Sequence, residues 1–323
     1  MATSQLKQSK RSTGRAMAGG IRTVDTPLAV LFPLLASEKT EFSLAERTAQ
    51  LLPTLQTTLD IPQLLGLFHN HIKQSIPHDG VLYRYPNGAG ELFTGIPGKH
   101  SCVYRLVVEG TELGEITFSR GRPFSDAEIA VLESQICALV YPLRNGLSYK
   151  AAMDQARRDP LTGVYNRGVI EVALEREVSL ARRYCSPLSV IFMDIDHFKA
   201  VNDTFGHMVG DEVIREFARC VNDKIRTTDI LSRYGGDEFV AILPNTTKEG
   251  AEQLAGRIRD AVVNSGCLDK IGLAKIGQGL RITTSLGIAS LEDDESAQQL
   301  LDRADKSLSL AKHAGRDCIR FLS

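Results

Sequence analysis

The chain contains 323 residues, with 43% hydrophobic residues, 24% charged residues and a formal net charge of −1 at pH 7. This length allows two domains that each bury an ordinary hydrophobic core, and the balanced charge gives no support for nucleic acid as a partner. The apolar stretch from Thr26 to Ala36 is too short to span a bilayer, so we predict no transmembrane segment.

Residues 1–42 are predicted to form a flexible basic arm. Residues 1–24 hold five basic side chains and no acidic one, among Ser, Thr and Gly. A basic stretch before an apolar one is also the pattern of a signal peptide. However, Ala36-Ser37-Glu38 is a weak cleavage context, so we favour an ordered or partner-binding arm.

Residues 43–145 have the pattern of a small mixed domain. A helix is predicted near 60–75, and strand-like segments follow at 81–85, 102–108 and 113–118. This order resembles a divergent GAF domain, a family that senses small ligands or dimerises, although a diagnostic motif is missing. His69 and His71 point in different directions on a helix, so we interpret them as surface or core residues and not as metal ligands.

Residues 125–158 are predicted to form a linker helix. Ser125 and Glu128 have the spacing of a capping box. Five apolar residues then recur at spacings of three and four, namely Ile129, Leu132, Ile136, Leu139 and Leu143. This pattern is typical of a coiled-coil seam between two subunits, but a helix packed on its own domain fits it equally well. Pro142 and Gly146 predict a kink.

The segment from Arg233 to Phe239, with the sequence RYGGDEF, is the most informative part of the chain. It lies between two alternating apolar segments, which predicts a β-hairpin with its glycines at positive φ. The hairpin carries two adjacent carboxylates, Asp237 and Glu238. Such a pair suits a hard cation such as Mg2+ and the phosphates that this cation bridges.

A second acidic site follows the apolar run 188–193, which predicts a buried strand that ends near Asp194. If this strand pairs with the hairpin, Asp194 approaches Asp237. Close carboxylates repel each other unless a cation or a proton neutralises them. A Mg2+ site is the economical interpretation, and two solvated acids at strand ends are the alternative.

Several motifs occur in a fixed order along the second half of the chain. They are DPLTG at 159–163, DIDHFK at 194–199, NDTFGH at 202–207, GD at 210–211 and RYGGDEF at 233–239. Together they resemble the catalytic domain of diguanylate cyclases, the GGDEF family, over residues 159–321. We therefore assign residues 159–323 to this domain.

The resemblance implies a central antiparallel sheet surrounded by helices, as in nucleotidyl cyclases and polymerase palms. Alternating strand and helix patterns from residue 167 to 321 independently indicate an α+β or α/β fold. We expect an α+β protein in which a helix joins the GAF-like domain to the cyclase domain.

The resemblance also implies a reaction, in which two GTP molecules condense to cyclic di-GMP and two pyrophosphates between two facing domains of a homodimer. Asp194, Asp237 and the Ile195 carbonyl are the implied ligands of Mg2+, for which Mn2+ can substitute. Glu238 would assist the metal site, and Asp237 is the candidate for activating the attacking 3′-hydroxyl.

Guanine recognition is implied for Asn202 and Asp211, with His207 close to the substrate. A carboxylate can accept from guanine N1–H and from its amino group together, whereas adenine lacks both donors. Helix capping is the alternative role for Asn202 and Asp211.

Phosphate binding is predicted at two places. Backbone N–H groups around Phe198 and Lys199 lie at a predicted helix start, which suits an anion. Lys312 and Arg316 are four residues apart, hence on one face of a predicted helix. They resemble the family's contacts to the β- and γ-phosphates, and a solvated basic face is the alternative.

An inhibitory product site is implied by Arg226 and Asp229, which match the family's RxxD motif, with Arg257 as a third contributor. Arginine forks bind phosphate and stack on guanine. GTP chemistry predicts a cytoplasmic location. The alternative function is a receptor for GTP or cyclic di-GMP without turnover.

Overall fold

The computed structural model describes residues 22–25, 51–264 and 282–322. The chain divides into two compact units, residues 1–152 and 153–323, each described here by itself. The division falls inside the predicted linker helix. None of the helices in the described ranges is long and apolar enough to cross a membrane.

The first unit contains a five-stranded sheet with the order β1-β4-β5-β2-β3. Its strands are β1 (Arg22–Asp25), β2 (Gly80–Arg84), β3 (Glu91–Gly95), β4 (His100–Val108) and β5 (Thr111–Arg120). A short 3-10 turn, η3 (Pro86–Gly88), precedes β3. The strands predicted near 81–85, 102–108 and 113–118 are confirmed. Sequence analysis missed β3, because it is a short edge strand with only one half-buried side chain.

The predicted arm of residues 1–42 lies mostly outside the described residues, but residues 22–25 do not fit it. They form β1, which pairs in parallel with β4. Arg22 also donates to Glu133 at 2.7 Å. Backbone pairing and this ion pair order a stretch that its basic composition predicted to be flexible.

Helices α2 (Ile61–Ser75) and α3 (Asp126–Ala156) pack against one hydrophobic core in this unit. Ser125 and Glu128 form the predicted capping box, with the Ser125 N–H donating to Glu128 at 2.8 Å and the Glu128 N–H donating to Ser125 at 3.3 Å. His69 is buried beside His78, with 2.9 Å between their ring nitrogens, so its interpretation as a core residue is confirmed.

Of the two interpretations of the apolar spacing in the linker, packing on its own domain is supported. Helix α3 is one element of 31 residues that includes Pro142, and the kink predicted there stays a prediction. Of the predicted subunit seam, Leu132, Ile136, Leu139 and Leu143 are buried in the core of their own unit. The apolar spacing therefore serves packing within the chain, which was the alternative interpretation.

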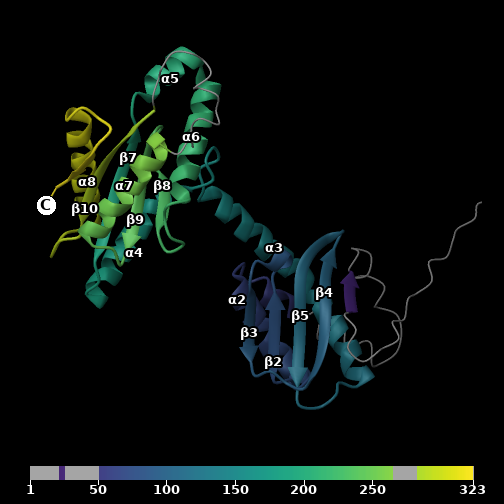
Figure 1. Ribbon diagram of the computed structural model, residues 1–323. Helices are drawn as coiled ribbons and strands as arrows, with labels where there is room; N and C mark the ends of the chain where they lie inside the picture. The colour runs from purple at the N-terminus through teal and green to yellow at the C-terminus, as the bar shows by residue number, and fades with distance from the viewer. Residues whose placement is uncertain (1–21, 26–50, 265–281, 323) are drawn as a thin grey trace, which may run out of the picture. The chain divides into compact units, whose positions relative to one another are not determined.

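The second unit contains a six-stranded sheet with the order β11-β10-β7-β9-β8-β6 (Figure 1). Its strands are β6 (Tyr165–Asn166), β7 (Leu188–Ile195), β8 (Ile230–Arg233), β9 (Glu238–Pro244), β10 (Thr284–Ser290) and β11 (Ile319–Phe321). The four central strands are antiparallel, as predicted, whereas β6 and β11 pair in parallel at the edges.

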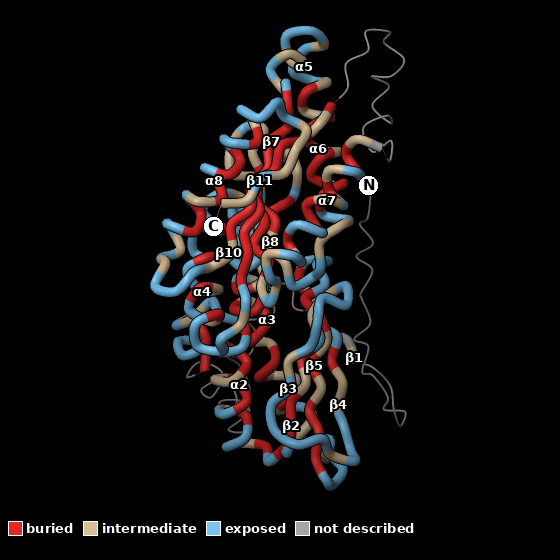
Figure 2. The backbone as a smooth tube through the Cα atoms, turned by 60° about the vertical axis from the view of Figure 1, so that its left-hand side comes forward, coloured by how far each residue is buried: buried red, intermediate tan, exposed pale blue. Residues whose placement is uncertain are grey.

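Helices cover both faces of this sheet. Helices α6 (His207–Asn222) and α7 (Lys248–Asn264) pack on one face, and α4 (Arg167–Tyr184) and α8 (Ala297–His313) pack on the other. The short α5 (Phe198–Phe205) leads from β7 to α6. All eight residues of β7 are buried, and β7 and β10 are red in Figure 2.

Arg120 is the polar centre of the first unit. It is 3% exposed, donates to Glu128 through two nitrogens at 2.9 and 2.5 Å, and donates to the carbonyls of Pro77 and Pro123. Hydrogen bonds from Arg120, followed by those from Ser125, lower the pKa of Glu128 to about 2. Arg120 therefore joins the end of β5 to the start of α3.

Arg120→Leu is expected to lower the free energy of unfolding of this unit by about 3 kcal/mol, because it removes a buried charge that has five acceptor contacts. Urea unfolding followed by circular dichroism measures the change. Arg122→Leu is the matched control. Its side chain is 69% exposed and meets the same Glu128 at 3.5 Å, so we expect a loss of at most about 0.5 kcal/mol. Equal losses for the two variants would contradict this assignment.

Candidate active site

The RYGGDEF hairpin and the end of β7 meet as predicted. Asp194 and Glu238 are directly opposite each other across β7 and β9. The Ile195 N–H donates to the Asp237 carbonyl at 3.3 Å. The two acidic motifs, 43 positions apart from Asp194 to Asp237 in the sequence, therefore share one end of the sheet.

The predicted backbone conformation of the hairpin glycines is wrong. Neither Gly235 nor Gly236 has φ between +20° and +160°. Gly235 is required because the side chain of Glu238 lies against it: a Cβ at this position would be 2.6 Å from Oε2 of Glu238. A Cβ at Gly236 would meet nothing within 4 Å, so the backbone is open to a ligand at this position.

A clamp between Asp159 and Arg233 fixes the hairpin turn. Nη1 of Arg233 lies 3.1 Å from both carboxylate oxygens of Asp159, and its Nε and Nη2 donate to the Gly236 carbonyl at 3.1 and 2.7 Å. Asp159 also accepts from the N–H and hydroxyl of Thr162. Burial raises the pKa of Asp159, but the bonds from Thr162 and Arg233 outweigh it, so the pKa is lowered. Sequence analysis identified both motifs without linking them.

Asp194 is the most strongly perturbed acid of the site. It is 7% exposed and accepts a hydrogen bond from Nζ of Lys312 at 2.7 Å. Burial is the main cause that raises the pKa of Asp194, and the hydrogen bond from Lys312 opposes it. Repulsion from Asp237 and Glu238 raises the pKa further, and the resulting pKa of Asp194 is about 6. The predicted mutual repulsion of these acids is therefore present.

The metal ligand set stays a prediction, but its chemistry fits a hard cation. Asp194, Asp237 and the Ile195 carbonyl offer only oxygen donors, which Mg2+ prefers. Within the described ranges, no group of three or more His, Cys, Asp or Glu side chains converges closely enough to hold a metal. The two carboxylates and one carbonyl would thus supply only part of the coordination shell of the cation.

The two residues predicted to contact the outer phosphates lie in different elements. Lys312 is in the last turn of α8 and pairs with Asp194. Arg316 is exposed and follows the end of α8 at His313. The prediction that both lie on one helix face is therefore wrong, because the helix stops and Gly315 turns the backbone with φ of 109°.

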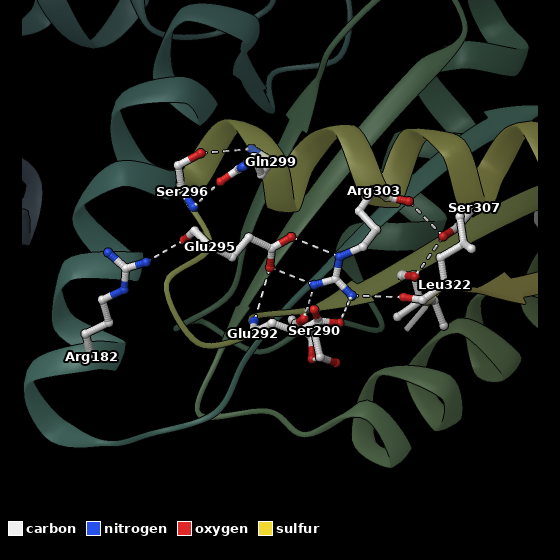
Figure 3. A network of polar contacts seen from close by, with 11 residues as sticks. Arg182, Ser290, Glu292, Glu295, Ser296, Gln299, Arg303, Ser307 and Leu322 are labelled. Carbon is white, nitrogen blue, oxygen red and sulfur yellow. Dashed lines mark hydrogen bonds and ion pairs between the residues drawn. The ribbon is translucent and has the colours of Figure 1, made fainter.

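Helix α8 is anchored at its other end by the polar network in Figure 3. Arg303 bonds to Glu295 at 2.6 Å, to Glu292 at 2.7 Å and to the Leu322 carbonyl at 3.0 Å. Ser296 and Gln299 form a capping box at the first turn. These contacts fix the position of α8, and hence the backbone that carries Lys312.

The packing of α5 on α6 brings Asn202 against Gly210, the residue before Asp211. A Cβ at Gly210 would lie 1.9 Å from Oδ1 of Asn202, so only glycine allows this approach. The capping alternative is wrong, because the N-cap residues of α5 and α6 are His197 and Gly206. His207 is exposed at the start of α6.

The start of α5 retains the backbone expected of an anion site. His197 is the N-cap with φ of 57° and makes no side-chain cap bond. Its carbonyl accepts from Ala200 and Val201. The N–H groups of Phe198 and Lys199 make no hydrogen bond to another residue in the described part of the chain. Their role in phosphate binding stays a prediction.

Arg226, Asp229 and Arg257 line one cavity of about 550 Å3, as their predicted common role requires. Oδ2 of Asp229 accepts from the Arg226 N–H at 2.8 Å, while its Oδ1 is buried without a recorded partner in the described residues. Arg226 and Asp229 also border a second cavity of about 660 Å3, whose rim includes Arg158, Arg215 and Arg219. Product binding at this place stays a prediction.

Asp196 is a site residue to which sequence analysis gave no role. It is 2% exposed and accepts from the hydroxyls of Thr283 and Ser285, both at 2.7 Å, and from the Asp317 N–H at 3.0 Å. The DxD spacing after a buried strand is the only signal in the sequence that could have identified it.

Comparisons with known proteins establish the family. Residues 156–318 match the model for "Diguanylate cyclase, GGDEF domain". The chain is 30% identical over 272 residues to diguanylate cyclase DgcS of Shewanella oneidensis, which covers 84% of this chain and 88% of that protein. Diguanylate cyclase DgcP of Pseudomonas aeruginosa is 40% identical over 163 residues, which are 50% of this chain and 23% of that protein. The chain therefore belongs to the GGDEF family of diguanylate cyclases.

A solved structure agrees with the fold. The coiled coil and GGDEF domain of DgcB from Caulobacter crescentus, in complex with c-di-GMP, is 28% identical, with a TM-score of 0.50. The match covers 61% of this chain and 100% of the DgcB chain. The GAF-like character of the first unit stays a prediction.

Asp159→Asn is expected to lower the free energy of unfolding at pH 7 by about 2 kcal/mol, since the largely covered Arg233 side chain would lose its charged partner. Because the pKa of Asp159 is lowered on folding, this stability is present above its usual pKa of 3.8 and is lost as the pH falls further. Urea unfolding at pH 7 and pH 3 checks both statements. Glu171→Gln, which breaks the exposed pair with Arg167, is the control and should leave the free energy of unfolding nearly unchanged.

Asp194→Asn is expected to stabilise the metal-free protein at pH 7 by about 1–2 kcal/mol, because the folded state disfavours this charge. The folded pKa of about 6 lies above the usual 3.8, so stability falls as the pH rises between these values, and the loss persists above them. Thermal unfolding in EDTA should show the gain at pH 7 and none at pH 4. A variant less stable than the parent at pH 7 would refute the assignment.

Proposed function

We propose that this chain condenses two GTP molecules into cyclic di-GMP and two pyrophosphates. The observation that carries the proposal is the convergence of Asp194, Asp237 and Glu238 at one end of the sheet. Three mutually repelling acids are unfavourable unless a cation and its phosphates arrive there. Membership of the diguanylate cyclase family supports the same chemistry.

Guanine is proposed to bind between α5 and α6. The Asp211 carboxylate would accept from guanine N1–H and the amino group, and Asn202 would bond to the purine edge. The close approach of Asn202 to Gly210 supports this, since Asp211 is the next residue of α6. An adenine base would leave the Asp211 carboxylate without donors, which favours GTP over ATP.

The acidic end of the sheet is proposed to hold the triphosphate through Mg2+, or Mn2+, with Asp194, Asp237 and the Ile195 carbonyl as ligands. When bound, the cation would neutralise phosphate charge and lower the pKa of the attacking 3′-hydroxyl. Lys312, released from Asp194, and Arg316 would contact the outer phosphates, and Phe198 and Lys199 would offer N–H groups. Asp237 or Glu238 would accept the proton of the hydroxyl.

The reaction requires two catalytic domains, so the active species is proposed to be a homodimer in the cytoplasm, where GTP is available. Four of the five residues of the predicted helical seam are buried in the core of the first unit, so we propose that other residues form the pairing surface. The first unit is proposed to regulate pairing as a GAF-like domain. Arg226, Asp229 and Arg257 would bind the product and inhibit synthesis.

Product formation from GTP and Mg2+ by the purified chain tests the proposal. We expect cyclic di-GMP from the parent and at least about 100-fold less from Asp237→Asn, because a ligand and candidate base is lost. Asp305→Asn, an exposed acid on α8, is the matched control and should retain the parent rate.

A folded parent that yields no product at high concentration would overturn the cyclase proposal. Binding of cyclic di-GMP that depends on Arg226, without turnover, would instead establish the receptor alternative.

A further inference from the structure

The turn after α8 is held in an unfavourable backbone conformation. Gly315, Arg316 and Asp317 have φ of 109°, 63° and 44° in succession. Residues other than glycine rarely adopt positive φ and persist there when surrounding contacts fix them. Arg316, which we assign to the outer phosphates, therefore depends on whatever holds this turn.

Asp317 supplies those contacts in two directions. Its N–H donates to Oδ2 of Asp196 at 3.0 Å, directly after the metal-binding end of β7. Its carboxylate and carbonyl both accept from Nε of Arg259, at 2.8 and 2.9 Å. The turn is therefore hydrogen-bonded on one side to the residue that follows β7 and on the other side to α7.

Asp196 is a rigid anchor for this turn. Thr283 and Ser285 donate to separate oxygens of its carboxylate, and its own N–H donates to the Thr283 carbonyl at 3.0 Å. With all of these bonds formed in a buried position, Asp196 has little freedom to move. The Arg316 N–H also donates to the Ala311 carbonyl at 3.2 Å. Besides these bonds to Ala311 and Asp196, Arg259 is the contact that ties the turn to α7.

We propose that Arg259 is a positioning residue for the triphosphate: through Asp317 and Asp196 it holds Arg316 against the metal-binding end of β7. This inference rests on the proposed function. In the described part of the chain, Arg259 contacts neither the residues proposed to bind guanine nor the proposed metal ligands. The effect of Arg259 should therefore be confined to the outer phosphates of GTP. The guanine base and the first phosphate should bind as before.

The test is equilibrium binding, by calorimetry with Mg2+, of two nucleotides to the full chain. One is GTP with a methylene bridge between its α- and β-phosphates, which cannot react, and the other is GMP. For Arg259→Gln we expect the affinity for the triphosphate to fall about 10-fold, with the affinity for GMP unchanged within about twofold. Arg105→Gln, which breaks an exposed ion pair with Glu112, is the control and should change neither affinity.

A double-mutant cycle separates positioning from a general structural effect. Because Arg259 acts through the turn, Arg316→Gln combined with Arg259→Gln should bind the triphosphate no more weakly than Arg316→Gln alone, within about twofold. Additive losses would overturn the proposal. So would unchanged triphosphate binding in Arg259→Gln, or equal losses for both nucleotides in a protein that keeps the parent's circular dichroism.

The failure of the proposed function has a different signature. If the parent chain binds neither nucleotide, the guanine site itself is wrong, and this inference falls with it. If the parent binds both but Arg259→Gln changes neither affinity, only the role of Arg259 is refuted.

Discussion

The antiparallel pairing of β7 with β9 and β10 is the constraint on which the candidate active site depends. Its register sets Asp194 opposite Glu238 on one side and opposite Ser285 on the other. Because side chains alternate between the faces of a strand, a slip of one residue would turn the acids into the opposite layer. The buried apolar residues of β7 prevent that slip, so the hydrophobic core fixes the position of the charges.

Local patterns in the sequence were sufficient to predict this part of the molecule. The apolar run before Asp194 and the alternation around RYGGDEF gave β7, β8, β9 and their meeting point correctly. Contacts between distant segments were not predictable in the same way. The Asp159–Arg233 clamp joins residues 74 positions apart, and the Lys312–Asp194 bond spans 118 positions. No local periodicity encodes such pairs, because the fold alone brings them together.

The errors have a common physical origin, since each assigned a residue's role without knowing its neighbours. Apolar spacing along α3 predicts a buried stripe but does not say what buries it, and here the stripe faces its own unit. Gly235 was attributed to backbone conformation, yet the side chain of Glu238 excludes a Cβ there. Arg316 was placed on a helix that in fact ends at His313.

Helix α7 carries Arg257, which lines the cavity proposed to bind the product, and Arg259, which bonds to Asp317 in the turn after α8. The two residues are two positions apart and therefore about 200° apart around the helix axis. If product binding at Arg257 alters the affinity for the triphosphate through this helix, the triphosphate must alter the affinity for the product by the same factor. Feedback of this kind would weaken as GTP rises. The enzyme would then respond to the ratio of its product to its substrate, and not to the concentration of the product alone.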